Sequence, residues 1–212
     1  MKDWHAWHTA YDDPTSRLSR RLAVVQRFLR DALDARAAGP IRLLSLCAGE
    51  GRDVIGVLRD HPRRDDVRGL LVEADPGLAD RAARSIVGAG LDEHLVAIVG
   101  DAGTTDTLDQ GVPADVLLLC GIFGNITDAD VEHTVRNASR MCARDAAVLW
   151  TRHPRPPDLT VSIRRWFAES GFAEVAFEAP EELMFGVGSH RLISEPEPFA
   201  RDLRLFSFVE PG

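Results

Sequence analysis

The sequence predicts an α/β fold, a three-layer sandwich in which a mainly parallel sheet has helices on both faces. From residue 41 onward, short apolar runs that suit strands alternate with amphipathic segments that suit helices. This alternation is typical of parallel strands joined by crossover helices. The run 115–120 is almost entirely apolar, as expected of a strand that is buried on both faces.

The expected elements follow in order. Asp13 and Pro14 indicate a helix start, and the apolar spacing beyond them predicts an amphipathic helix that ends at Gly39-Pro40. Next, we expect strands at 41–47, 69–73, 95–99, 115–120 and 146–151, and helices at 52–59, 76–87 and 158–170, with another helix from Thr127 whose apolar face extends to Cys142. The segments 173–177 and 186–193 are expected to form a hairpin, and 203–209 is a third candidate for the sheet.

Length and composition narrow the class of protein. The 212 residues suffice for one domain, with an N-terminal aromatic segment and helix at 1–40 and the main α/β part at 41–212. No apolar run has the length of a membrane helix, and the N-terminus lacks an apolar signal core, so we predict a cytoplasmic protein. The net charge of -8, without a basic stripe, disfavours a nucleic-acid partner. Three cysteines without a CxxC pair disfavour a disulfide framework or a metal site.

A glycine-containing turn follows the first predicted strand. It reads Cys47-Ala48-Gly49-Glu50-Gly51, and glycine lets a backbone approach a ligand closely. A dinucleotide-binding turn would have a third glycine where this sequence has Val54. Because S-adenosylmethionine has no pyrophosphate to seat there, the pattern favours it over NAD or FAD. A tight turn without a ligand is the structural alternative.

Acidic residues follow the second and third predicted strands. Glu73 ends the second strand, where a carboxylate can accept both hydroxyls of a ribose. Asp75 precedes Pro76 and serves either the cofactor or the next helix as a cap. Asp101, which Ala102 follows, can accept a hydrogen bond from an adenine amino group, or can cap a helix. The ordered set of signals after three successive strands is more specific than any one of them.

These segments resemble the successive cofactor motifs of class I, Rossmann-like S-adenosylmethionine-dependent methyltransferases. The resemblance covers roughly residues 41–195 and rests on 44–53, 71–76, 100–102 and 115–125. The opening Trp-x-x-Trp-His segment and the later Gly121–Asn125 also resemble an uncharacterised bacterial subset of that family. The resemblance implies a seven-stranded sheet with an antiparallel terminal strand, S-adenosylmethionine as the cofactor and S-adenosylhomocysteine as its product.

Two positions depart from the family pattern. Ser45 stands where the family usually has an acid, and Cys47 stands where it usually has glycine. In the family the acid steadies the amino-acid end of the cofactor, so in this chain that role passes to residues elsewhere or is met by backbone carbonyls.

The loop after the fourth predicted strand reads Gly121-Ile122-Phe123-Gly124-Asn125. The resemblance places this loop beside the transferred methyl group. We expect Gly121 to permit close approach, Phe123 to pack on adenine or substrate, and Asn125 to hydrogen-bond the ligand or to cap the next helix. The loop differs from the Asn-Pro-Pro-Tyr type, which argues against adenine in DNA or glutamine as the acceptor.

Methyl transfer is an in-line displacement that needs alignment of the reactants, exclusion of water and removal of a proton from a hydroxyl or ammonium acceptor. Histidine, with an ordinary pKa of about 6.5, suits the last task. His8 and His153 are the first candidates for this base, ahead of His5 and His190. A surface or structural role is the alternative for each.

The first twelve residues carry Trp4, Trp7 and Tyr11, which are costly to leave in water. We expect this segment and the start of the next helix to close over the cofactor as a lid. Tyr11 and either Arg20 or Arg21 would then meet the methionine carboxylate, because the guanidinium fork matches two oxygens. A cap that only packs on the sheet is the alternative.

The sequence therefore predicts an enzyme that transfers a methyl group from S-adenosylmethionine to an oxygen or nitrogen atom of a small-molecule acceptor. A peptide or protein methyltransferase and a non-catalytic S-adenosylmethionine-binding protein are the alternatives, and Val54 counts against an NAD-dependent oxidoreductase. The sequence identifies neither the acceptor nor the oligomeric state.

Overall fold

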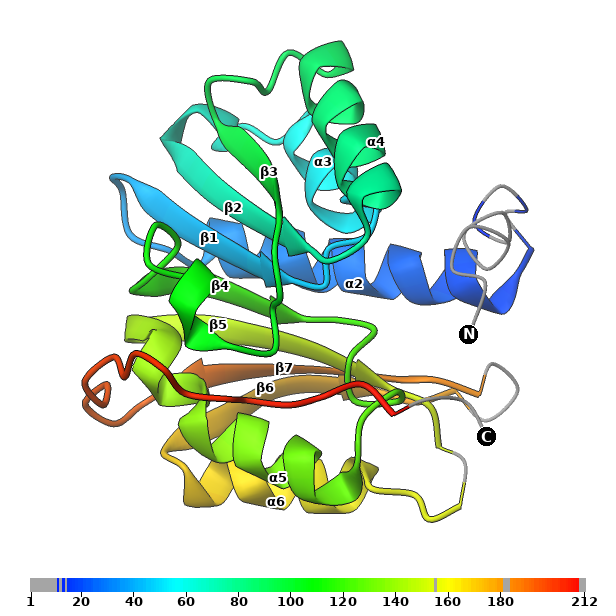
Figure 1. Cartoon of the computed structure of the whole chain (residues 1–212), viewed down its shortest axis with the longest axis vertical. Helices are drawn as coiled ribbons and strands as arrows, with labels where there is room; N and C mark the ends of the chain where they lie inside the picture. The colour runs from blue at the N-terminus through cyan, green and yellow to red at the C-terminus, as the bar shows by residue number, and fades with distance from the viewer. Residues whose placement is uncertain (1–10, 12, 14, 155, 181–183, 210–212) are drawn as a thin grey trace.

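The computed structural model describes residues 11, 13, 15–154, 156–180 and 184–209. Seven strands form one sheet in the order β3-β2-β1-β4-β5-β7-β6 (Figure 1). They are β1 (Ile41–Leu46), β2 (Val67–Glu73), β3 (Leu95–Val99), β4 (Ala114–Leu119), β5 (Cys142–Arg152), β6 (Phe172–Glu178) and β7 (Gly186–Leu192). Neighbouring strands are parallel from β3 to β5, whereas β7 is antiparallel to both β5 and β6. The predicted α/β class, the seven strands and the antiparallel last strand are confirmed.

Helices cover both faces of the sheet. On one face lie α2 (Arg17–Asp34), α3 (Arg52–Leu58) and α4 (Pro76–Gly88), and on the other lie α5 (Asp128–Asn137) and α6 (Thr160–Glu169). Figure 1 shows α3 and α4 beside β1–β3, with α5 and α6 packed together near the β5–β7–β6 end. None of the described helices combines the length and the hydropathy that crossing a bilayer requires.

Each face of the sheet has its own hydrophobic core. The core under α2 and α3 joins Val25 and Leu29 to sheet residues such as Leu43, so α2 belongs to the same packed unit as the sheet. The core under α5 and α6 is centred on Trp150, which packs against Phe167 with ring centroids 6.3 Å apart. Gly188 on β7 makes room for that indole, because a Cβ there would lie 2.3 Å from Trp150 Cε2.

Several expected boundaries are wrong. The first helix was expected to end at Gly39-Pro40, but α2 ends at Asp34. The first helix was expected to begin at Pro14, but α2 begins at Arg17 because Ser16 caps it, its hydroxyl accepting from the Ser19 N–H at 3.0 Å. Cys142 was expected on a helix face, but it opens β5. The helix ends at Asn137, and a short 3₁₀ turn over Ala138–Met141 then leads the chain into the sheet.

The structure also shows which of the late segments enter the sheet. The pair 173–177 and 186–193 forms the antiparallel hairpin β6–β7, as predicted. The segment 203–209 stays outside the sheet and makes only isolated bridges, Thr104 with Arg204 and Ile126 with Phe208. Its Leu205 N–H donates to the Gly103 carbonyl at 2.8 Å, and its buried Phe206 enters the core on the α5 side. It is the red trace that runs in front of the sheet above α5 in Figure 1.

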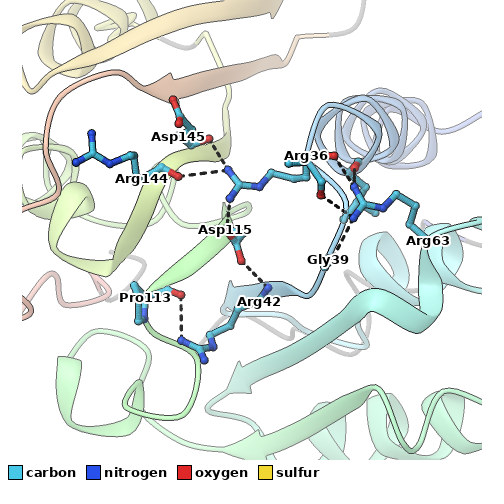
Figure 2. Close-up of polar contacts among 10 residues, drawn as sticks. Arg36, Gly39, Arg42, Arg63, Pro113, Asp115, Arg144 and Asp145 are labelled. Carbon is cyan, nitrogen blue, oxygen red and sulfur yellow. Dashed lines mark hydrogen bonds and ion pairs between the residues drawn. The ribbon is translucent and has the colours of Figure 1, made fainter.

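Arginine side chains fix the amino ends of the strands (Figure 2). The Arg63 guanidinium donates to four carbonyls, those of Leu33 at 3.1 Å, Arg36 at 2.6 Å, Ala37 at 2.9 Å and Gly39 at 3.0 Å. It thereby satisfies backbone acceptors at and beyond the end of α2. The Asp115 carboxylate accepts from the Arg36 guanidinium and, at 2.8 Å, from the Arg42 N–H, which ties the starts of β1 and β4 together. The candidate functional site lies at the opposite edge of the sheet, at the carboxyl ends of the strands.

Candidate functional site

The topology of the sheet places a candidate site at the carboxyl ends of β1 and β4. β1 lies between β2 and β4, so the connections that leave β1 and β4 go to opposite sides of it. In open α/β sheets, ligands bind in the crevice at such a reversal of strand order. Strands β1 to β5 are parallel, so the loops that follow them all begin at this edge.

The turn after β1 is held in a left-handed conformation. The φ angles are 53° at Cys47, 57° at Gly49 and 68° at Gly51. The turn is closed by the Gly51 N–H, which donates to the Ala48 carbonyl at 2.9 Å. Cys47 therefore keeps the backbone conformation that glycine adopts easily, at a cost of about 1–2 kcal/mol. Burial, reinforced by the charge of Glu73, raises the pKa of the Cys47 thiol, which stays protonated.

The Glu73 carboxylate connects this turn to the end of β2. Its Oε2 accepts from the Gly49 N–H at 2.7 Å, and its Oε1 accepts from the Asp75 N–H at 2.9 Å. Each carboxylate oxygen can accept a further hydrogen bond. Glu73 is half-buried and is held in place by two backbone donors. This arrangement suits the recognition of two neighbouring hydroxyl groups.

The structure gives the other two acids local roles. Asp75 caps α4, and its Oδ1 accepts from the N–H groups of Gly77 at 2.8 Å and Leu78 at 3.0 Å. Asp101 accepts from the Gly103 N–H at 2.8 Å and from the Arg204 guanidinium at 2.6 Å. Ala102 is buried beneath that loop. Of the two roles that the sequence left open for Asp75, capping is the one observed.

In the loop after β4, Gly121 borders open space, whereas Phe123 lies in the core. Gly121 has a φ of 79°, and a Cβ there would meet nothing within 4 Å. The Asn125 amide donates to the Gly121 carbonyl at 2.7 Å, so this side chain shapes its own loop. Phe123 is fully buried, with its ring centroid 6.1 Å from that of Trp150. Phe123 was expected to pack on adenine or substrate, but the structure places it in the hydrophobic core.

His153 lies against this loop. A Cβ on Gly124 would be 3.0 Å from His153 Cδ2, so the imidazole packs on the loop backbone. His190 lies elsewhere, in the core, where its ring stacks on Phe167 with centroids 4.5 Å apart. Burial lowers the pKa of His190 to about 4. His153 is therefore the described histidine at the loop edge. The other histidine candidates, His5 and His8, and most of the expected lid lie outside the described residues.

Tyr11 and Arg21 lie together near the first turn of α3. Arg21 Nη2 donates to the Tyr11 hydroxyl at 2.7 Å, and the Arg52 guanidinium lies 5.4 Å from the centroid of the Tyr11 ring. Burial raises the pKa of Tyr11, although the charge of Arg21 opposes this, so the hydroxyl stays protonated. Arg20 is exposed, so Arg21 is the one of the two arginines that contacts Tyr11.

The sequence analysis did not single out Asp53 and Arg152. Asp53 lies in the first turn of α3 and accepts from the Val54 N–H at 2.8 Å. Burial raises the pKa of Asp53, and the charge of Arg21 partly offsets this. Arg152, the buried last residue of β5, donates to the Phe123 carbonyl and so supports the loop after β4. Asp53 is the second residue after the Gly-x-Gly turn, which is a signal in the sequence, whereas a buried arginine at a strand end leaves none.

No family model and no curated protein matches the sequence. Solved structures do match its fold. A crystal structure of an RNA methyltransferase from Salinibacter ruber in complex with S-adenosyl-L-homocysteine is 22% identical, with a TM-score of 0.56, over 85% of this chain and 95% of that chain. A possible exported protein from Bordetella parapertussis is 20% identical, with a TM-score of 0.65, over 84% of this chain and 68% of that one.

A third match is an O-methyltransferase family protein from Burkholderia thailandensis. It is 17% identical, with a TM-score of 0.61, over 85% of this chain, and the alignment spans only 60% of that longer protein. At these identities the likeness establishes the fold. The chain has the Rossmann-like α/β fold that these methyltransferase structures share.

Proposed function

We propose that this protein is an S-adenosylmethionine-dependent methyltransferase that methylates an oxygen or nitrogen atom of a small molecule. One observation carries the proposal. Glu73 is held by the backbone of Gly49 and of Asp75 at the end of β2, the strand next to β1, where the strand order reverses. A carboxylate fixed there, next to a left-handed glycine turn, is suited to the two hydroxyls of an adenosine ribose. The fold that the chain shares with methyltransferases agrees with this reading.

The residues around the turn fit the cofactor. Glu73 would hold the ribose, and the turn from Cys47 to Gly51 would lie against the adenosine. The loop at Asp101 would border the adenine, and the open space beside Gly121 leaves room for the methyl-bearing end. When bound, the cofactor supplies a methyl group that its sulfonium already activates.

The chain's own residues have to align the acceptor and take its proton. His153 packs on the loop after β4, at the edge where the acceptor would enter. We assign it the role of base toward a hydroxyl or ammonium acceptor. Gly121 and Asn125 form the loop that would border the acceptor, and Arg152 supports that loop from the core side through the Phe123 carbonyl. His8 is a second candidate for the base, and residues 1–12 are proposed to cover the pocket.

The net charge of the chain bears on whether the acceptor is RNA or a small molecule. The Salinibacter ruber protein is an RNA methyltransferase, whereas the net charge of this chain is -8. Many of its arginines are bound to carboxylates or carbonyls, such as Arg63 and Arg36. A protein that binds RNA through its phosphates needs unneutralised basic side chains. We therefore favour a small-molecule acceptor, and the three free cysteines agree with a cytoplasmic location.

A methyl-transfer screen tests the proposal. The protein would be incubated with methyl-labelled S-adenosylmethionine and separate pools of small hydroxyl compounds, small amines, peptides and RNA. Label should enter a small-molecule pool, and His153→Gln should lower the rate without changing the affinity for S-adenosylhomocysteine. Binding of NAD without binding of S-adenosylhomocysteine would overturn the assignment. Label in RNA or peptide alone would refute the acceptor class while leaving the reaction type in place.

A further inference from the structure

The amino-acid end of S-adenosylmethionine carries an ammonium group as well as a carboxylate. The resemblance leads one to expect an acid at position 45, but this chain has a serine there, which is 1% exposed inside β1. A bound ammonium is therefore met either by backbone carbonyls or by a carboxylate from another part of this edge. The question is which acid has a free oxygen in the right place.

Two of the three acids around the turn are already engaged. Glu50 pairs with Arg52 at 2.7 Å and with Arg81 at 3.0 Å, one arginine on each oxygen. Both oxygens of Glu73 accept backbone N–H groups, and their remaining acceptor capacity is assigned to the ribose. Asp53 differs, because its Oδ1 accepts from the Val54 N–H and, among the described residues, no cation lies within 4.0 Å of its carboxylate. Within the described part of the chain, Asp53 is thus a carboxylate at this edge without an ion pair, although the charge of Arg21 acts on it from a longer distance.

The surroundings of Asp53 place it at the carboxyl-end edge of the sheet, near the end of β4. It lies in the first turn of α3, directly after the left-handed turn. The start of α3 is held against α2 by Gln26, whose amide donates to the Arg52 carbonyl at 2.9 Å. Arg21 lies one turn before the buried Val25 on the same stripe of α2, which brings it to the carboxyl-end edge of the sheet. The charges of Asp53 and Arg21 both act on the Cys120 thiol, at the end of β4.

This arrangement is complementary to a zwitterion. Arg21 and the Tyr11 hydroxyl, joined at 2.7 Å, offer donors to a carboxylate, and Asp53 offers an acceptor to an ammonium. Asp53 is half-buried, and a carboxylate partly withdrawn from water without an ion pair is costly, so an ammonium that binds there gains a strong interaction. We infer that Asp53 binds the ammonium group of the cofactor and replaces the acid that position 45 lacks. The inference rests on the proposed function.

Two ligands that differ only at the amino-acid end test the inference. S-adenosylhomocysteine has the ammonium and carboxylate, and 5′-methylthioadenosine lacks both. Titration calorimetry would be run with the wild-type protein, Asp53→Asn and the control Asp60→Asn, whose carboxylate pairs with Arg30 at the surface, away from the turn. For Asp53→Asn we expect S-adenosylhomocysteine to bind about 10- to 100-fold more weakly, while the affinity for 5′-methylthioadenosine changes less than about 3-fold. The control should change neither.

Other outcomes have distinct meanings. If Asp53→Asn weakens both ligands equally, Asp53 is only a cap of α3 and the inference is overturned, as it also is if neither affinity changes. Asp53→Ser provides a second variant in case the first does not fold, because serine can still accept from the helix N–H groups without a charge. If the wild-type protein binds neither ligand, the proposed function itself has failed.

Discussion

Gly49 combines a left-handed backbone conformation with a place in the proposed cofactor site. It is buried, its φ is 57°, and its N–H donates to Glu73. Gly49→Ala adds a Cβ to a left-handed position, so we expect it to lower the free energy of unfolding by about 1–2 kcal/mol and to weaken S-adenosylhomocysteine binding at least about 10-fold. Urea unfolding and titration calorimetry measure the two effects.

Gly39 provides a matched control for that variant. It also has a positive φ, 122°, and a Cβ there would meet nothing within 4 Å, but it lies at the amino ends of the strands. Gly39→Ala should lower stability without weakening the binding of the ligand. If Gly49→Ala binds S-adenosylhomocysteine as the wild type does, the turn after β1 is not part of the cofactor site.

His190 makes the stability of the core depend on pH. Its Nδ1 accepts from the Trp150 indole at 3.2 Å, and burial lowers its pKa to about 4, while Glu174 acts in the opposite direction and Arg164 adds to the shift. The unfolded chain binds the proton near pH 6.5, so stability is lost as pH falls from about 6.5 toward about 4. The loss contributed by this residue is at most about 3 kcal/mol.

His190→Gln removes that titration, and His133→Gln, which changes an exposed histidine on α5, is its control. Unfolding free energies measured across this pH range should fall less steeply for His190→Gln than for the control. Glu174 contributes in a lower range, because Arg164 lowers its pKa below the ordinary value and its effect is lost only when it protonates. Identical pH profiles for the two variants would show that His190 does not gain a proton on unfolding.

At the scale of elements, Arg63 fixes the end of α2 and the entry into β1. One guanidinium serves four carbonyls, among them those of Arg36 and Gly39 in Figure 2, and it also pairs with the Asp66 carboxylate. Lysine cannot reproduce this planar set of donors, so Arg63→Lys should lower the free energy of unfolding by about 1–3 kcal/mol. Since the network lies at the amino ends of the strands, the affinity for S-adenosylhomocysteine should not change.

Arg84→Lys, on the exposed face of α4 where Arg84 pairs with Asp80, is the control and should leave unfolding unchanged. Denaturant unfolding of both variants measures their free energies of unfolding. Equal stability of the two would mean that water replaces the Arg63 bonds at no cost, and a loss of ligand affinity in Arg63→Lys would mean that the two ends of the sheet are coupled.

At the scale of the whole molecule, the sequence predicted the sheet better than its loops. Strand–helix alternation predicts the parallel strands because the central strands are largely apolar, as in the run 116–119 of β4. The segment 203–209 has the same alternation as a strand, yet it lies across the core because Phe206 is buried there and β6–β7 already completes the sheet. Periodicity shows that such a segment is half-buried and does not reveal which surface it covers.

The candidate site was predictable where residue type and strand order agree. The sequence predicted that Glu73 and Gly49 lie at the ligand edge, and the structure joins them at 2.7 Å, which no sequence pattern indicates. Phe123 was placed wrongly because an aromatic residue in a loop can face either the ligand or the core, and only packing against Trp150 decides between them. Asp53 was missed because an acid at a helix start suits capping equally well.

Titration of Glu73→Gln with S-adenosylhomocysteine tests the central claim most directly. The substitution keeps the size of the side chain and removes its charge, so at most one oxygen can still accept. We predict that binding weakens by about 1.5–3 kcal/mol, or roughly 10- to 150-fold, while Glu93→Gln, in the exposed loop before β3, binds as the wild type does. An unchanged dissociation constant for a Glu73→Gln protein that folds normally would contradict the assignment of this edge of the sheet to the cofactor.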